Sequence, residues 1–222
     1  METTVRPVSP KDLAAFQCRL CGDCCRDLKD QLMLEPLDIY RLGRYLREQG
    51  QAVDTEDLYA QFAHAAMLTD GFPVFLMNTT GTDHACVFLC GHRCSIYPAR
   101  PRACRLYPFS VCPDKAGAKF QYYQCMDAHA GHFSGGEVRI RDWMMQNLSQ
   151  EDRNFLGKES DYAARLGRCL HHADPAQRKE WLFPILFYRY YNYDLERPFM
   201  EQYERNHREL LNHLRSRHRK ER

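Results

Sequence analysis

One cysteine spacing constrains this 222-residue chain more than any other feature. Residues 16–25 read Phe-Gln-Cys-Arg-Leu-Cys-Gly-Asp-Cys-Cys, so four thiols follow one another as C-x2-C-x2-C-C. Each C-x2-C step lets one tight turn aim two sulfurs at the same ion, and Gly22 supplies the positive φ that such a turn commonly needs. Ten of the eleven cysteines precede residue 126, and an odd number cannot pair completely within one chain. We therefore predict metal binding by thiols, led by Cys18, Cys21, Cys24 and Cys25.

The compartment expected from the sequence also favours metal ligands over disulfides. The first residues, METTVRPVSPKDL, lack the apolar core of a signal peptide, and no apolar run approaches the roughly 20 residues that cross a bilayer. We expect a cytoplasmic protein with no membrane partner, in which thiols stay reduced. The formal net charge of +2 argues against nucleic acid as a partner.

A second group of cysteines begins 61 residues after the first group ends. It is interspersed with arginines, whose guanidinium groups would offset the negative charge of clustered thiolates and favour the ligand form. The cysteines are Cys86, Cys90, Cys94, Cys104, Cys112 and Cys125, and the arginines are Arg93, Arg100, Arg102 and Arg105. Neither cysteine group alone obviously supplies the full ligand set of a metal site, but the two groups together can.

Adjacent Cys24 and Cys25 raise the question of how many centres there are. Because neighbouring side chains usually point apart, we expect these two sulfurs to serve different centres, which predicts two metal sites or one cluster beside one ion. The nearby histidines are interpreted as surface residues or as partners of the ligands rather than as ligands, and they are His84, His92 and His129.

Composition and periodicity divide the chain into a cysteine-rich part and a helical part. We predict a mainly α protein with a small irregular or β element, in which a metal-stapled N-terminal lobe, residues 1–133, packs on a C-terminal helical bundle, residues 134–222. Helices are expected from Pro36 to Gly50, from Asp54 or Thr55 through Ala65 or Ala66, from Ser149 to about His171, from Asp174-Pro175 with a kink or break at Pro184, and from Pro198 onward. Short strands are expected at 73–78 and 119–125.

Several motifs resemble those of a known family. Phe-x-Cys-x-x-Cys-Gly-x-Cys-Cys-Arg is followed by Cys-x-Phe-Leu, by Arg93-Cys94-Ser95-Ile96-Tyr97 with Arg100-Pro101, and by Cys104-Arg105-Leu106-Tyr107-Pro108-Phe109. Over roughly residues 16–130 these motifs closely resemble the CxxCxxCC zinc- or iron-chelating family of YkgJ-type cysteine cluster proteins, whose domain also occurs in flagellin lysine N-methylases. The resemblance implies metal ligation by the cysteines that match its pattern, which are Cys18, Cys21, Cys24, Cys25, Cys86, Cys94, Cys104 and Cys125. Two further cysteines look like additions and rank as second-choice ligands, Cys90 and Cys112.

The identity of the metal and the presence of an activity stay open at this level. Sulfur-only ligation suits Zn²⁺ and iron–sulfur centres alike, and the C-x2-C-x2-C spacing shared with bacterial ferredoxins tips the balance slightly towards a [4Fe–4S] cluster. As an alternative function, the resemblance implies S-adenosylmethionine-dependent N-methylation of a lysine in a protein substrate. Against that alternative, no glycine-rich loop of the usual cofactor-binding kind follows a predicted strand.

Overall fold

The computed structural model describes residues 4–114, 119–126, 130–133 and 135–218. Its internal contacts divide the chain into two units that do not follow the chain order. Unit 1 comprises Met1–Lys29 with Thr79–Ser160, and unit 2 comprises Asp30–Asn78 with Asp161–Arg222. The single domain boundary expected between residues 133 and 134 does not coincide with this division and stays a prediction.

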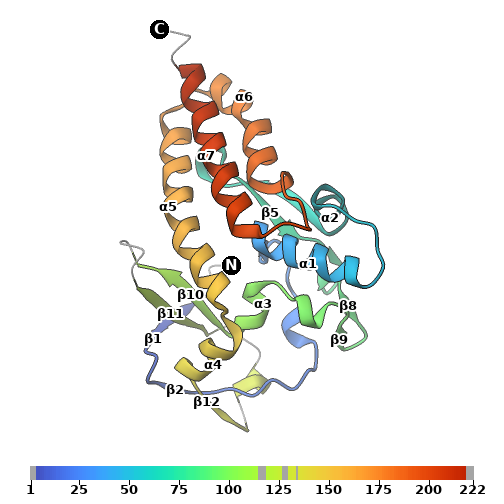
Figure 1. The fold of residues 1–222 in the computed structure, drawn as a ribbon. Coiled ribbons are helices and arrows are strands. Elements are labelled where there is room, and N and C mark those ends of the chain that lie inside the picture. The colour runs from blue at the N-terminus through green and yellow to red at the C-terminus, as the bar shows by residue number, and fades with distance from the viewer. Residues whose placement is uncertain (1–3, 115–118, 127–129, 134, 219–222) are drawn as a thin grey trace. The chain divides into compact units, whose positions relative to one another are not determined.

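Unit 1 is built from small antiparallel sheets and short helices (Figure 1). Its helices are α3 (Arg102–Leu106), α4 (Ile140–Asn147) and the first part of α5 (Gln150–His172), and its 3₁₀ turns are Asp23–Cys25, Tyr97–Ala99 and Ala130–Phe133. A three-stranded sheet has the order β1 (Val5–Val8), β11 (Phe120–Cys125), β10 (Phe109–Pro113). The two-stranded pairs are β12 (Glu137–Arg139) with β2 (Leu13–Ala15), β6 (Thr79–Thr80) with β7 (Ala85–Cys86), and β8 (Leu89–Cys90) with β9 (Arg93–Cys94).

An aromatic core fixes the start of the cysteine loop in unit 1. The ring of Phe16 is 3% exposed and packs edge-on against Trp143, with 5.1 Å between ring centroids, and against Phe109, at 6.0 Å. Leu106 and Met144 belong to the same buried cluster. Because burying a side chain of this size is worth about 2–3 kcal/mol, the segment that leads into the first cysteine is held firmly.

Unit 2 is mainly helical. Its helices are α1 (Pro36–Glu48), α2 (Thr55–Phe62), the second part of α5, α6 (Pro175–Leu186) and α7 (Phe199–His218), with a π-helical turn at Phe187–Tyr191 and a 3₁₀ turn at Thr69–Gly71. A three-stranded antiparallel sheet has the order β3 (Met33–Leu34), β5 (Pro73–Met77), β4 (Ala63–Met67). In Figure 1 α5, α6 and α7 run side by side, and a buried cluster joins them through Leu166, Trp181 and Leu210.

The predicted class is confirmed, because the described residues are mostly helical with small sheets. The caps explain why the helix starts were predictable. In α2, Asp54 accepts a hydrogen bond from the backbone N–H of Asp57 at 2.9 Å, and Asp57 returns the bond, which makes a capping box. The strands at 73–78 and 119–125 are also present, as β5 and β11. The predicted packing of one lobe on the other stays a prediction, and no helix among the described residues has the length and apolar character needed to cross a bilayer.

One prediction about helix continuity was wrong, and so was part of another. The second helix ends at Phe62, and Ala65 and Ala66 lie in β4, where they pair with Phe75 and Val74 of β5. Helix propensity there is overridden by pairing with a neighbouring strand. The break expected at Pro184 is absent, because the helix continues to Leu186 before it widens into the π-helical turn, and the alternative of a kink there stays a prediction.

A buried ion pair joins α3 to the first turn of α5 within unit 1. The carboxylate of Asp152 is 0% exposed and accepts hydrogen bonds from both terminal nitrogens of Arg105, at 2.9 and 3.2 Å. Asp152 also accepts a hydrogen bond from the backbone N–H of Ser149 at 2.8 Å, and the Ser149 hydroxyl accepts one from the N–H of Asp152. Ser149 and Asp152 therefore cap the start of α5.

We predict that Asp152→Ala lowers the free energy of unfolding by about 3–5 kcal/mol, because it leaves the Arg105 guanidinium partly buried without its carboxylate. Denaturant titration followed by circular dichroism measures this. The matched control is Asp161→Ala on the same helix, which removes an exposed pair with Arg165 and is expected to cost no more than about 0.5 kcal/mol. Equal losses in the two variants would contradict the prediction.

Candidate metal centre

The first cysteine loop is shaped by one glycine and one short turn. Gly22 adopts the left-handed conformation, with φ 80°, and directly precedes the 3₁₀ turn Asp23–Cys25. The N–H of Cys25 donates to the carbonyl of Gly22 at 2.9 Å, which closes the turn. An L side chain is disfavoured at such a φ, so glycine at this position follows from the turn itself.

The second cysteine segment lies directly against this loop. A Cβ atom at Gly22 would come within 2.9 Å of the carbonyl oxygen of His92 and within 3.0 Å of the Leu89 side chain. Further along, the N–H groups of Asp27 and Leu28 donate to the carbonyls of residues 83 and 84, at 2.9 and 3.1 Å. An ion pair between Arg26 and Asp83 adds to the contact. Two segments more than 50 residues apart are thus joined by backbone contacts.

Four cysteines from these two segments are linked through Cys24, which interacts with each of the other three, and we call them the four-thiol group: Cys24, Cys25, Cys86 and Cys94. The side chains of Cys24 and Cys25 are hydrogen-bonded to each other. Cys24 and Cys94 both act electrostatically on Cys86, and Cys24 acts on Cys94. Cys86 is buried and the other three are partly buried. The side chains of Cys24 and Cys25 thus meet rather than point apart, and whether they serve one centre or two stays a prediction.

Two of the sulfurs accept a hydrogen bond from the backbone N–H of the residue two positions later in the chain. Cys86 accepts such a hydrogen bond from Phe88, and Cys94 accepts one from Ile96. Burial raises the pKa of both thiols, whereas these hydrogen bonds oppose the rise, because an N–H donor favours the thiolate. Arg100 also opposes the rise at Cys94, but burial has the larger effect and the pKa of both thiols stays above its usual value, so a cation is needed to favour the thiolates that bind a metal.

The pKa of Cys24 is raised well above its usual range. The largest cause is the hydrogen bond from the Cys25 side chain, followed by burial, and the positive charge of Arg100 opposes both. Two adjacent thiols cannot both ionise easily without a cation between them, as with any pair of like charges. A divalent ion would supply that cation.

The arginines divide into different roles. Arg100 acts on Cys24 and Cys94, as the sequence predicts, and its guanidinium lies 3.5 Å from the centroid of the Tyr97 ring. Arg105 is instead engaged by Asp152 in the ion pair described above.

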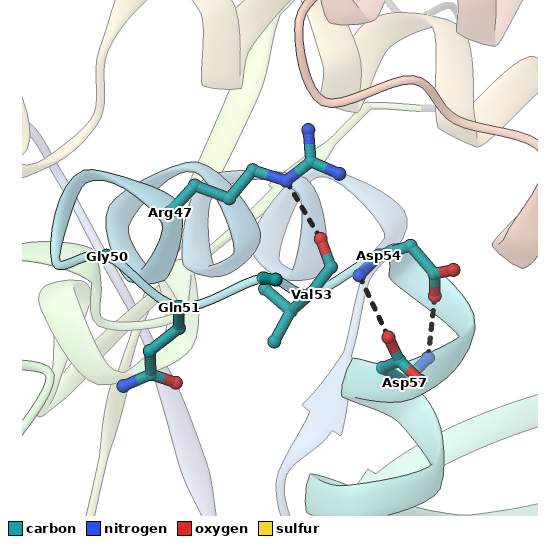
Figure 2. A pocket seen from close by; sticks show the side chains of 7 residues that line it. Arg47, Gly50, Gln51, Val53, Asp54 and Asp57 are labelled. Carbon is teal, nitrogen blue, oxygen red and sulfur yellow. Dashed lines mark hydrogen bonds between the residues drawn. The ribbon is translucent and has the colours of Figure 1, made fainter.

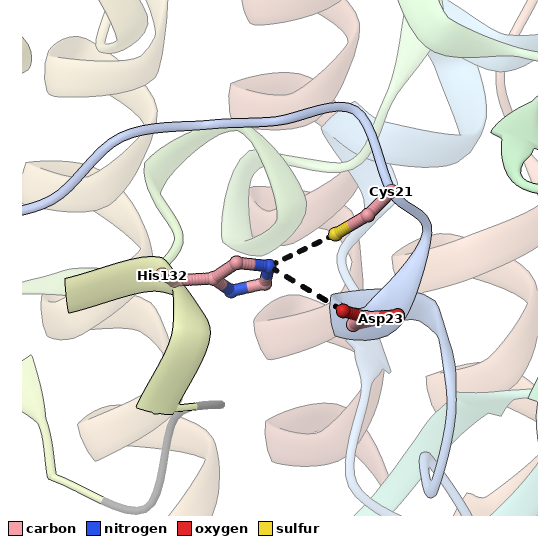
Figure 3. A group of neighbouring side chains, drawn as sticks. All are labelled: Cys21, Asp23 and His132. Carbon is pink, nitrogen blue, oxygen red and sulfur yellow. Dashed lines mark hydrogen bonds and ion pairs between the residues drawn. The ribbon is translucent and has the colours of Figure 1, made fainter. Parts of the chain in front are cut away.

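A second, mixed group of possible ligands adjoins the first cysteine loop (Figure 3). It consists of Cys21, Asp23 and His132, whose ligand atoms all lie within 4.8 Å of one another. Neither Asp23 nor His132 is predicted by the cysteine pattern. The sequence signal for them is weak, because a histidine 111 residues away from a cysteine gives no spacing to recognise.

The remaining predicted ligands occupy different surroundings. Cys18, Cys90 and Cys112 are exposed, Cys104 is partly buried on α3, and Cys125 is partly buried at the end of β11. Their role as ligands stays a prediction, as it does for the four-thiol group. Cys169 is partly buried on α5, and all eleven cysteines are thiols rather than halves of disulfides in the structure. His129 lies outside the described residues.

A pocket in unit 2 has a structural explanation. It lies in the connection from α1 to α2 and is lined by Arg47, Val53, Asp54, Asp57 and the chain between them (Figure 2). The Arg47 side chain donates to the carbonyl of Val53 at 2.8 Å, and the two aspartates cap α2. The side chains of Arg47, Asp54 and Asp57 thus bond within this connection, and they hold it in place.

We predict that Gly22→Ala destabilises the protein more than Gly91→Ala does. Both glycines have positive φ, at 80° and 62°, but a Cβ at Gly91 would meet no atom within 4 Å. The control should lose about 1 kcal/mol from backbone strain alone, and Gly22→Ala at least about twice that, because its Cβ also pushes the two cysteine segments apart. Denaturant titration of the metal-loaded proteins measures the difference, and equal losses would show that the close approach is unimportant.

Comparison with known proteins agrees with the motifs. The family model CxxCxxCC, described as a "putative zinc- or iron-chelating domain", matches residues 17–129, just over half of the chain. No curated protein and no solved structure gives a significant match. The relation to flagellin lysine N-methylases and the cytoplasmic location stay predictions. The match contains both cysteine segments in the order described above, and the chain belongs to the CxxCxxCC family of zinc- or iron-chelating domains.

Proposed function

We propose that the protein is a metal-binding protein whose four-thiol group holds one Zn²⁺ ion, with an iron–sulfur cluster as the alternative occupant of the same sulfurs. The observation that carries the proposal is that Cys24, hydrogen-bonded to Cys25, acts electrostatically on Cys86 and Cys94 of a segment far away in the chain. Sulfur-only sets of four ligands are typical of structural zinc and of iron–sulfur centres.

One contact supports our choice of a single ion over a cluster. The [4Fe–4S] interpretation depended on Cys18, Cys21 and Cys24 reaching one cluster, whereas Cys21 contacts His132 and Asp23 instead. Two thiolates on one zinc ion lie about 3.8 Å apart, given Zn–S bonds of about 2.3 Å in a tetrahedron. The hydrogen-bonded thiols of Cys24 and Cys25 suit such a pair.

The site would act mainly on the fold of unit 1. Four thiolates around a divalent ion carry an excess of two negative charges, which Arg100 and the N–H groups aimed at the sulfurs reduce. Structural zinc contributes about 10–16 kcal/mol of apparent binding free energy, whereas a whole domain is stable by only about 5–15 kcal/mol. The irregular connections near the cysteines, with strands of two residues, would depend on that contribution.

The test is the metal content of protein purified without oxygen. We expect one zinc ion to be lost from Cys86→Ser and from Cys94→Ser, with a loss of affinity greater than the roughly 10–100-fold that follows removal of a hydrogen bond around a ligand. Cys169→Ser, outside both cysteine segments, should keep the wild-type content. A brown protein with bound iron and sulfide would select the alternative occupant. Unchanged metal content in both ligand variants would refute the proposal.

We predict that metal removal opens unit 1 and leaves unit 2 largely folded. After chelation, hydrogen exchange should accelerate in segments 18–28 and 79–95, because the ion no longer joins them. Exchange in α6 and α7 should change little, since their core of apolar side chains contains no predicted ligand. Mass spectrometry of proteolytic fragments measures the exchange of the cysteine segments and of α6 and α7 in one experiment. If the cysteine segments stayed protected after the metal was removed, the prediction would be wrong.

A further inference from the structure

The group formed by Cys21, Asp23 and His132 has the geometry of a site for a single ion. The Nε2 atom of His132 lies 3.1 Å from the sulfur of Cys21 and 4.0 Å from a carboxylate oxygen of Asp23 (Figure 3). Ligand atoms around a tetrahedral zinc ion lie about 3.5 Å apart for such a donor set. Both distances from Nε2 lie within about half an ångström of that value, and all three ligand atoms lie within 4.8 Å of one another.

The histidine is oriented by a second hydrogen bond. Its Nδ1 lies 3.1 Å from the hydroxyl of Tyr107, and its ring packs edge-on against Phe16 and Tyr107. When Nδ1–H donates to the hydroxyl, Nε2 presents its lone pair to Cys21 and Asp23. Metal-binding histidines are commonly fixed in this way through their other nitrogen. The His132 side chain is only 6% exposed, so few other orientations are open to it.

Backbone pairing brings the histidine to the cysteine loop. The carbonyl of His132 accepts the N–H of Gln17 at 3.0 Å, and the carbonyl of Gly136 accepts the N–H of Phe16 at 2.9 Å. The pairing continues along β2 and β12, where Ala15 lies opposite Glu137. A segment more than 100 residues downstream is thus held in register beside Cys18 and Cys21, independently of any contact within the four-thiol group.

We propose that Cys21, Asp23 and His132 form a second metal site, chemically distinct from the four-thiol group, that binds Zn²⁺ with a fourth position for water or a substrate atom. Sulfur, oxygen and imidazole nitrogen are all ligands that zinc accepts. Three protein ligands with a solvent position are typical of catalytic zinc, whereas four thiolates are typical of structural zinc. Cys21 and Asp23 lie inside the matched family region, whereas His132 lies beyond its end at residue 129, so the match does not assign the histidine or this grouping of three ligands.

Metal stoichiometry and cobalt spectra test the proposal. Wild-type protein reconstituted with Zn²⁺ should bind two ions per chain and His132→Ala one, while His92→Ala, at an exposed histidine beside the same loop, should still bind two. With Co²⁺, His132→Ala should lose the visible bands of a mixed nitrogen, oxygen and sulfur site and keep those of a thiolate site. Cys86→Ser with Cys94→Ser should show the opposite loss.

Tyr107→Phe separates a metal site from general damage to the fold. It removes only the hydroxyl that orients His132, so it should keep the stoichiometry of two and weaken one of the ions by roughly 10–100-fold. The inference would be overturned if the wild type bound one ion, His132→Ala still bound it, and the double variant Cys86→Ser with Cys94→Ser did not. That result would leave the four-thiol proposal intact. Two ions in His132→Ala, with wild-type affinities for both, would also overturn it.

Discussion

The cysteine-rich unit depends on holding several thiols of two distant segments close together although their charged forms repel one another. Cys24 shows the difficulty most clearly, because its neighbour Cys25 and its burial both oppose ionisation. N–H groups that donate to Cys86 and Cys94 and the positive charge of Arg100 oppose this effect, and Gly22 lets the two segments touch. Each of these contributions is small, so most of the negative charge of the thiolates would have to be offset by a bound cation. Metal binding and the stability of the unit would therefore be linked.

Local signals in the sequence were sufficient for most helices. Pro36, Asp54, Ser149 and Asp174 each mark a start that the structure reproduces, because capping hydrogen bonds involve residues only three positions apart. The error at Ala63–Met67 has the opposite origin. Whether that segment is helix or strand depends on a partner strand formed later in the chain, and alanine-rich sequence carries no signal of such a partner.

The candidate site likewise has one part that local sequence predicts and another that depends on distant segments of the chain. The C-x2-C-x2-C-C run identifies the thiols of the first loop without any structure, and the family match covers both cysteine segments. Which thiols share a centre could not be predicted, because it depends on how the chain turns at Gly22. His132 could not be predicted either: it reaches Cys21 only through the pairing of β2 with β12, which joins strands more than 100 residues apart.

Charge explains why one loop would serve two kinds of centre. A divalent ion held by four thiolates keeps an excess of two negative charges and needs nearby cations, and Arg100 acts on that group. An ion held by one thiolate, one carboxylate and a neutral imidazole is formally neutral and needs none, so it can keep a solvent position without further compensation. Placing Cys21 apart from Cys24 therefore lowers the negative charge that any one centre must carry. The left-handed turn at Gly22, between Cys21 and the 3₁₀ turn that carries Cys24, is the local feature that separates them.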